Sequence, residues 1–347
     1  MIFSNLLVKW YLQNKRDLPW RNTQNPYYIW LSEIMLQQTR VDQGMPYFYS
    51  FIENFPTVFD LANATEQEVL KLWQGLGYYS RARNLHKTAQ TVAFELNGTF
   101  PNNYKALLKL KGVGDYTAAA IASFSFNEKV PVVDGNVFRV LSRYFGIESD
   151  ISIASTKKEF QDLAFELMPN DAIATFNQAI MEFGALQCVP KNPNCSVCVM
   201  NHSCVALQKK MVNQLPVKSK KIKVTQRYFN YLILEDENEK TIINQRTDKG
   251  IWHNLYEFPL IETLADVDDK IIATLIKEHI LFENKINNIF SLNEKSQLHI
   301  LTHQRLHIKF WKIEINGVLQ NGIDIEKLKT YPFPIVLFNF IENHFRN

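Results

Sequence analysis

The spacing of apolar residues predicts helices over the first part of the chain. From Asn5 to about Arg143 apolar positions recur every three or four residues. Three pairs of residues that favour turns interrupt this pattern: Asn25-Pro26, Asn97-Gly98 and Lys111-Gly112. Asn25 followed by Pro26 is a favourable N-cap and first-turn pair, so we expect a helix from Pro26 to about Gln38 with Glu33 near its middle.

A different pattern begins after Arg227. Aromatic and β-branched residues alternate there with polar residues at a period near two, which is typical of half-buried strands. The segments concerned are Tyr228–Leu234, Thr241–Arg246 and Leu306–Ile315. The second part is therefore expected to be α+β.

Composition fits a soluble globular protein of more than one domain. The 347 residues are 46% hydrophobic and 21% charged, and no apolar run reaches the roughly 18 residues of a membrane span. The first 21 residues mix apolar positions with Lys9, Lys15 and Arg16 and lack the pattern of a signal peptide. We expect a cytoplasmic protein that makes no contact with a membrane.

The basic excess of the chain is concentrated in one stretch. Residues 205–227 hold seven basic and no acidic residues, whereas the net charge of the whole chain is only +3. This run, with Lys218, Lys220, Lys221 and Lys223, is either a solvated linker or a segment that touches nucleic-acid phosphates. We place the domain boundary here and expect a helical region at 1–208, a basic linker at 209–226 and a second domain at 227–347.

All four cysteines fall in one short segment. Cys188, Cys195, Cys198 and Cys204 have the spacing C-x6-C-x2-C-x5-C. Four thiols in one loop favour a shared metal centre over disulfides. Zinc and an iron-sulfur cluster both accept four thiolates, and the spacing alone leaves the choice open.

A short turn between two predicted helices could hold a phosphate. Gly112 and Gly114 flank Val113 between an apolar helix and an alanine-rich helix that begins near Tyr116. Two glycines let the backbone approach a ligand, and the amides of the following helix point outward. An ordinary helical turn with glycine caps is the alternative.

Two carboxylates occupy opposed sequence environments. Glu33 lies among apolar and aromatic residues, so desolvation should favour its protonated form, whereas Asp134 precedes a predicted helix from about Asn136 to Phe145, where an N-cap position should favour the anion. Cleavage of an N-glycosidic bond needs such an acid and such an anion. Glu33 as a solvated helix residue and Asp134 as a simple cap remain alternatives.

Six motifs taken together resemble the adenine-specific mismatch DNA glycosylases, the MutY family of the endonuclease III-like superfamily. They are Leu18-Pro19-Trp20-Arg21, residues 31–39, residues 75–85, the hairpin with Gly112 and Gly114, residues 133–137 and the cysteine loop at 188–204. The resemblance implies a six-helix barrel module with a 4Fe-4S cluster module in residues 1–208. It also implies removal of adenine paired with 8-oxoguanine or guanine by base flipping, in base excision repair.

The resemblance assigns a role to each matching residue. Glu33 matches the general acid and Asp134 the carboxylate that stabilises the sugar cation, with Tyr116 and Asn136 assisting. Trp20, Arg21 and Gln178 match the adenine pocket, and the four cysteines match the cluster ligands. Residues that match contacts to 8-oxoguanine or a wedge in the duplex are Gln38, Thr39, Leu76 and Tyr78. Core packing is the alternative for Leu76 and Tyr78.

Tyr116 separates subclasses within this superfamily. Relatives that cut the DNA strand use a lysine at this position to form a Schiff base, which a phenol cannot do. A monofunctional glycosylase is therefore expected. A sister enzyme for other lesions and a catalytically silent damage-binding or electron-carrying protein are the alternatives.

Residues 227–347 resemble the Nudix-like C-terminal domain of the same family. Residues 250–259 match its characteristic stretch, but the acidic metal-binding box is missing, so we expect recognition of 8-oxoguanine without hydrolysis. The loop residues Thr302 and His303 match the family's probe of 8-oxoguanine, and Leu301 stands where the family has an aromatic residue. Lys111 replaces the usual hairpin proline. Double-stranded DNA is the expected partner of a monomer associated with the nucleoid, with downstream repair proteins as further partners.

Overall fold

The computed structural model describes residues 2–219, 223–279 and 286–345, so Lys220 and Lys221 of the expected linker lie outside the described residues. The chain divides into two compact units. The first contains residues 1–63 and 84–220, and the second contains residues 64–83 and 221–347. No described helix is long and apolar enough to cross a membrane.

The first unit is helical, as its sequence predicts. Its elements are α1 (Ile2–Asn14), η1 (Pro19–Arg21), α2 (Pro26–Met35), α3 (Val41–Asn54), α4 (Val58–Asn63), the greater part of α6 (Ser80–Gln90), η2 (Thr91–Glu95), α7 (Tyr104–Leu107), α8 (Asp115–Phe126), α9 (Gly135–Phe145), α10 (Ala154–Leu167), α11 (Ile173–Leu186) and α12 (Val205–Gln208). Helix α2 is shorter than predicted. It ends at Met35, and Gln38 adopts a positive φ of 57° as the chain turns toward α3.

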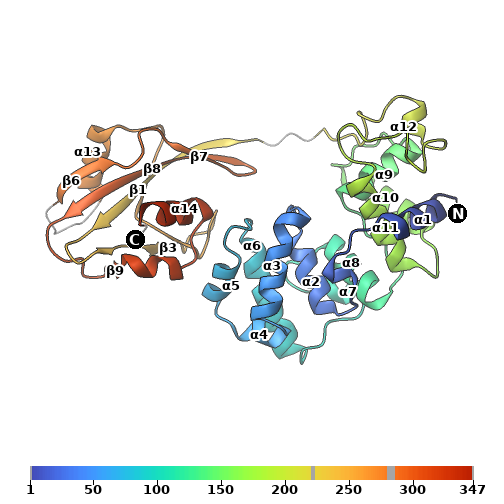
Figure 1. Cartoon of the computed structure of the whole chain (residues 1–347), viewed down its shortest axis with the longest axis horizontal. Coiled ribbons are helices and arrows are strands. Elements are labelled where there is room, and N and C mark those ends of the chain that lie inside the picture. Colours follow the sequence, from blue (N-terminus) through green and yellow to red (C-terminus); the bar gives the residue numbers. More distant parts are fainter. Residues whose placement is uncertain (1, 220–222, 280–285, 346–347) are drawn as a thin grey trace. The chain divides into compact units, whose positions relative to one another are not determined.

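Two packing groups build the helical unit. Helices α1, α9, α10 and α11 share one core, in which Leu7, Phe160 and Phe176 are completely buried. Figure 1 shows these helices grouped beside the N-terminus. Helix α8 packs against α2 and buries its alanines, so the two helices can approach closely. The two groups position the start of α8 and the start of α9.

The second unit is α+β. Its elements are α5 (Glu66–Leu72), β1 (Thr225–Glu235), β2 (Lys240–Thr241), β3 (Asn244–Gln245), β4 (Tyr256–Glu257), β5 (Leu260–Thr263), α13 (Asp269–His279), β6 (Ile286–Ser291), β7 (Gln297–Ile300), β8 (Gln304–Ile315), β9 (Ile323–Asp324), η3 (Ile325–Thr330) and α14 (Ile335–His344). The predicted strand at 241–246 is interrupted, because β2 pairs with β9 and β3 pairs with β4.

One mixed sheet organises this unit, in the order β5-β1-β8-β6 with β7 also paired to β8 (Figure 1). Strands β1 and β8 run parallel, with Thr225 opposite Gln304, and the other pairs are antiparallel. Side chains alternate across the sheet. Trp311 packs with Ile272 of α13, whereas the neighbouring Phe310 stacks on Phe340 of α14 at 3.9 Å. The two helices therefore cover opposite faces.

Residues 64–83 belong to the second unit although the first unit surrounds them in sequence. Their side chains bond to backbone groups near residues 253 and 331–333. The Lys71 ammonium donates to the Tyr331 carbonyl at 3.2 Å, and Gln74 accepts from the Phe333 amide at 3.0 Å. The Arg83 guanidinium donates to the His253 carbonyl at 2.8 Å. This division differs from the domain boundaries expected from the sequence, which remain a prediction.

Candidate active site

Helix α2 places Glu33 in the interior of the helical unit. The Asn25 side chain caps the helix by accepting from the Tyr27 amide at 2.9 Å, and Pro26 occupies the first turn. Most of the helix is buried, and Glu33 is only 6% exposed. A carboxyl group at such a position must be neutral or well hydrogen-bonded.

A cavity of about 560 Å³ joins Glu33 to residues far away in the sequence. Tyr116 of α8 and Asp134 at the start of α9 line the same cavity. The remaining lining residues come from the turn after α2, from α8, from the extended segment before α9, and from α9 and α10: Leu36, Gln37, Gln38, Gly114, Asp115, Thr117, Pro131, Val133, Gly135, Phe138, Lys157 and Gln161. The two carboxyl groups that the sequence singles out therefore share one cavity.

Burial raises the pKa of Glu33 to about 7. A hydrogen bond from the Tyr116 hydroxyl opposes this rise, and the neighbouring charge of Asp134 adds to it. The pKa of Tyr116 is itself raised well above its usual value, by burial and by Glu33, so its hydroxyl stays protonated and can donate. Glu33 thus holds its proton near neutral pH.

Asp134 caps α9. One of its oxygens accepts from the backbone amides of Asn136 and Val137, each at 2.8 Å, and the other accepts from the Asn136 side-chain amide at 2.7 Å. The cap is as predicted, and its hydrogen bonds lower the pKa of Asp134 as a cap should. Burial raises the pKa of Asp134, and its hydrogen bonds oppose the rise without cancelling it.

The hydrogen bonds still distinguish the two carboxyl groups. Three donors support a charge on Asp134, whereas one donor, Tyr116, supports a charge on Glu33. Because two neighbouring carboxylates repel each other, the better-supported group ionises first. The pair therefore combines a protonated acid and an anion at one cavity, as acid-assisted cleavage with a cationic transition state requires.

Arg139 holds Asn136, and sequence reasoning missed it. Its guanidinium donates to the Asn136 side-chain oxygen at 2.8 Å, to the Gly184 carbonyl at 2.6 Å and to the Cys188 carbonyl at 2.7 Å. Gly184 permits this close approach, because a Cβ there would lie 2.6 Å from the Asn136 Cβ. The acceptors lie as many as 49 residues away, so no local pattern signals this role.

The predicted hairpin lies between α7 and α8. Gly112 has φ of +78°, and a Cβ there would lie 2.7 Å from the Asn84 Cβ, so a side chain is excluded by conformation and by space. Thr88 fixes the turn by donating to the Lys111 carbonyl at 2.6 Å. Gly114 caps α8 and lines the cavity.

Trp20, Arg21 and Gln178 lie outside the residues that line this cavity. Trp20 is buried against Phe48, and Gln178 accepts from the Tyr11 hydroxyl at 2.6 Å. Arg21 is close enough to Glu33 for its charge to lower the pKa of that acid, although less than burial raises it. Arg21 and Gln178 are linked through Tyr11, since the Arg21 guanidinium lies over the Tyr11 ring.

Glu182 is a buried acid that the sequence did not reveal. It is 1% exposed and accepts from Arg21 and Arg16, each at 2.7 Å. Burial alone would raise its pKa, but the hydrogen bonds from Arg16 and Arg21 outweigh burial and lower the pKa to about 2. Glu182 is therefore charged and fixes both arginines next to α11.

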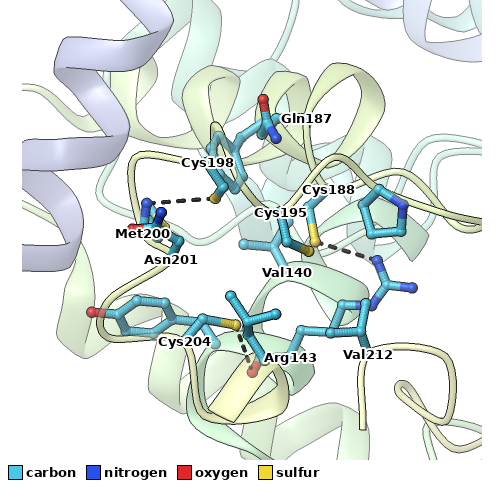
Figure 2. Close-up of a pocket in the computed structure, with 14 residues that line it drawn as sticks. Val140, Arg143, Gln187, Cys188, Cys195, Cys198, Met200, Asn201, Cys204 and Val212 are labelled. Carbon is cyan, nitrogen blue, oxygen red and sulfur yellow. Dashed lines mark hydrogen bonds between the residues drawn. The ribbon is translucent and has the colours of Figure 1, made fainter. Parts of the chain in front are cut away.

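The four cysteines line a second cavity of about 30 Å³. All four are free thiols, and Figure 2 shows them around one space next to Val140 and Met200. The Arg143 guanidinium donates to the Cys188 sulfur at 3.4 Å and to two backbone carbonyls of the same loop. In the described ranges no three acidic, histidine or cysteine side chains converge to hold a metal ion. Four thiols that line one cavity nevertheless make a suitable donor set for a cluster with several irons.

Known proteins resemble this chain over both units. Residues 31–166 match the HhH-GPD superfamily of base excision DNA repair proteins, and residues 230–343 match the NUDIX domain. An adenine DNA glycosylase of Buchnera aphidicola subsp. Schizaphis graminum is 36% identical over 88% of this chain and 86% of its own length. The chain belongs to the adenine DNA glycosylase family. The resemblance expected from the motifs is thereby confirmed.

Two further known proteins are similar to this chain. The human adenine DNA glycosylase is 43% identical over 61% of this chain and 41% of its own length. A solved thermostable thymine-DNA glycosylase is 32% identical, with a TM-score of 0.56, over 60% of this chain and 96% of that one. The expected helix-hairpin-helix region followed by a Nudix-like domain is also confirmed.

The family's expected contacts to the opposite base are divided between the two units. Gln38 and Thr39 lie in the helical unit, and the rest lie in the second unit. There the Tyr78 hydroxyl and the Thr302 hydroxyl are 2.7 Å apart, and both residues are exposed, as is His303. Leu76, by contrast, is 3% exposed, so packing accounts for most of its surface.

Proposed function

We propose that this chain removes adenine paired with 8-oxoguanine or guanine in duplex DNA. The observation that carries the proposal is the shared cavity in which burial raises the pKa of Glu33 to about 7 beside the capped Asp134. Family membership supports adenine as the base. A base inside a duplex must leave the stack to reach a buried acid, so the nucleotide is extruded into the cavity.

Glu33 acts as the general acid in this reaction. It gives its proton to the departing adenine as the bond between the base and C1′ of the sugar breaks with both electrons going to the base. Asp134 stabilises the positive charge that develops on the sugar, and Tyr116 and Asn136 hold the two carboxyl groups in place. A water molecule then bonds to C1′ and loses a proton, which completes hydrolysis.

The enzyme is proposed to be monofunctional. Tyr116 has no amine and a pKa raised well above its usual value, so it offers no nucleophile for a Schiff base. Adenine release should therefore leave an intact strand with an abasic site until alkali or another enzyme cleaves it.

Other residues are proposed to bind the DNA. Trp20, Arg21 and Gln178 contact the extruded adenine, and Gly112 and Gly114 hold a backbone phosphate through hairpin amides. The remaining proposed contacts, to 8-oxoguanine and the surrounding duplex, are Gln38, Thr39, Leu76, Tyr78, Thr302 and His303. The Nudix-like domain thus recognises the lesion and does not hydrolyse a nucleotide.

We assign the cysteine cavity to a 4Fe-4S cluster held by Cys188, Cys195, Cys198 and Cys204. Such a cluster can transfer an electron, but here its four ligands also tie down a loop with little regular structure. We favour this structural role. Arg143 supports it by donating both to Cys188 and to the backbone of the loop.

We further propose that the protein is a monomer in the cytoplasm and that it is associated with the nucleoid.

A single-turnover assay tests the proposal. The protein is mixed in excess with duplexes that carry adenine opposite 8-oxoguanine, adenine opposite guanine, or thymine opposite guanine. Release of adenine, with a loss of about 10²-fold or more in Glu33→Gln, is expected. Thymine release is the second candidate, because the thymine-DNA glycosylase is 32% identical to this chain. Release of thymine alone, or equal adenine release by parent and variant, would defeat the proposal.

A further inference from the structure

Lys157 lies on a wall of the catalytic cavity that the proposed mechanism does not use. It projects from α10 together with Gln161, one turn further along the same helix face, and both residues line the cavity that contains Asp134. Helix α10 is anchored beside this face, because Phe160 is completely buried and packs edge-on against Phe138 at 5.0 Å. Phe138 also lines the cavity.

The charges around the cavity are unbalanced for a DNA strand. Three of the lining residues are acidic: Glu33, Asp115 and Asp134. Among the described lining residues Lys157 is the one cation, and its side chain is exposed. An extruded nucleotide brings its flanking phosphates to the mouth of the cavity, where the carboxylates of Asp115 and Asp134 repel them. A cation on the wall beside Asp134 offsets that repulsion.

We propose that Lys157 binds a phosphate next to the extruded nucleotide, with Gln161 donating a second hydrogen bond to it. This inference rests on the proposed function, since it needs a nucleotide in the cavity. Lys157 acts in binding and has no part in the proton transfer. Its contact is distinct from the hairpin phosphate, which the backbone amides at Gly112 and Gly114 would hold.

Lys158 provides a matched control. It is the next residue on α10, but its ammonium pairs with Asp162 at 2.7 Å on an exposed surface, and it does not line the cavity. Binding is measured by fluorescence anisotropy for the parent, Lys157→Ala, Lys157→Arg and Lys158→Ala. The duplex carries a non-hydrolysable 2′-fluoro adenosine opposite 8-oxoguanine, and the titrations are repeated over a series of salt concentrations.

Lys157→Ala should weaken binding about fivefold at low salt and should reduce the slope of log Kd against log salt by about 0.9, as expected for one lost phosphate contact. Lys157→Arg and Lys158→Ala should behave like the parent. Neutral methylphosphonate linkages, introduced one at a time in the adenine strand, locate the contact. One of them should weaken the parent and leave Lys157→Ala unaffected.

Parental affinity and slope in Lys157→Ala would overturn the inference, as would equal losses in Lys157→Ala and Lys158→Ala. It would also fail if every methylphosphonate weakened parent and variant alike. Thermal melting confirms that each variant is folded. Adenine release by the parent on a cleavable duplex is scored separately. Its absence defeats the proposed function, whereas release combined with unchanged Lys157→Ala binding defeats only this inference.

Discussion

Glu33 and Asp134 have the same functional group and share one cavity, so their hydrogen bonds decide which of them carries the proton. Asp134 receives three donors at the start of α9, and Glu33 receives one from Tyr116. Sequence reasoning identified both carboxyl groups from their neighbours along the chain. It did not anticipate the burial that raises the pKa of Asp134, because this burial depends on α8, α10 and the segment before α9, which no local pattern reports.

The excision rate should therefore depend on pH in a bell shape. Above pH 7 Glu33 loses its proton, and the single-turnover rate should fall about tenfold per pH unit. At low pH the rate should fall as Asp134 becomes protonated, and this decline should begin above the usual range for an aspartate because its pKa is raised. A rate that stays constant through pH 8 would contradict the role of Glu33.

Glu33 should lower the stability of the folded protein at neutral pH. The pKa of Glu33 is about 7 in the folded protein against an ordinary value of 4.5, so the folded state binds more protons and stability falls as pH rises between these values. Glu33→Gln removes this titration. The variant should gain up to about 3 kcal/mol relative to the parent across that window. Thermal melting at several pH values measures the gain, and a pH-independent difference would contradict the explanation.

Helices α2, α8 and α9 bring the catalytic groups together. Their existence and approximate ends could be predicted, since caps such as Asn25 and Asp134 and the hydrophobic spacing are local signals. Arg139 and Glu182 could not, because their partners lie tens of residues away in sequence. The end of α2 was also missed, since the turn at Gln38 requires a positive φ without glycine.

The contact between α9 and α11 requires a glycine at position 184. In Gly184→Ala the new Cβ would lie 2.6 Å from the Asn136 Cβ and 3.0 Å from its backbone oxygen. The start of α9 must shift, and Asp134 shifts with it. We expect a loss of about 10²-fold in the single-turnover rate and about 1–3 kcal/mol in the free energy of unfolding. Parental rates in a folded Gly184→Ala would show that this contact is unimportant.

The cysteine loop should depend on the proposed cluster. Between α11 and α12 the chain has little regular structure, and Arg143 donates to only a few of its backbone groups. We expect Cys198→Ser to lose the visible absorbance of the cluster, to melt at a lower temperature and to bind DNA more weakly. Ser196→Ala, a substitution in the same loop, is the control. A Cys198→Ser protein with parental absorbance would contradict the ligand assignment.

At the scale of the molecule, the second unit contains two residues proposed to recognise 8-oxoguanine that bond to each other. Tyr78 comes from the segment 64–83 and Thr302 from the loop before β8, and their hydroxyls are 2.7 Å apart. Tyr78→Phe and Thr302→Val should each reduce the preference for adenine opposite 8-oxoguanine over adenine opposite guanine by about fivefold. The double variant should lose little more of this preference, because each change removes the same hydrogen bond. Fully additive losses, measured as ratios of single-turnover rates, would contradict this coupling.

The membership of residues 64–83 in the second unit also bears on how such proteins can change over time. Three side chains of residues 64–83 bond to backbone groups of the tail. A gene fusion that exchanged only the chain after residue 220 would have to place new backbone groups at the same positions to keep these bonds. A viable hybrid would need the short helical insert and the distant tail to come from the same ancestor. We therefore expect residues 64–83 and 221–347 to be inherited together, although they lie far apart along the sequence.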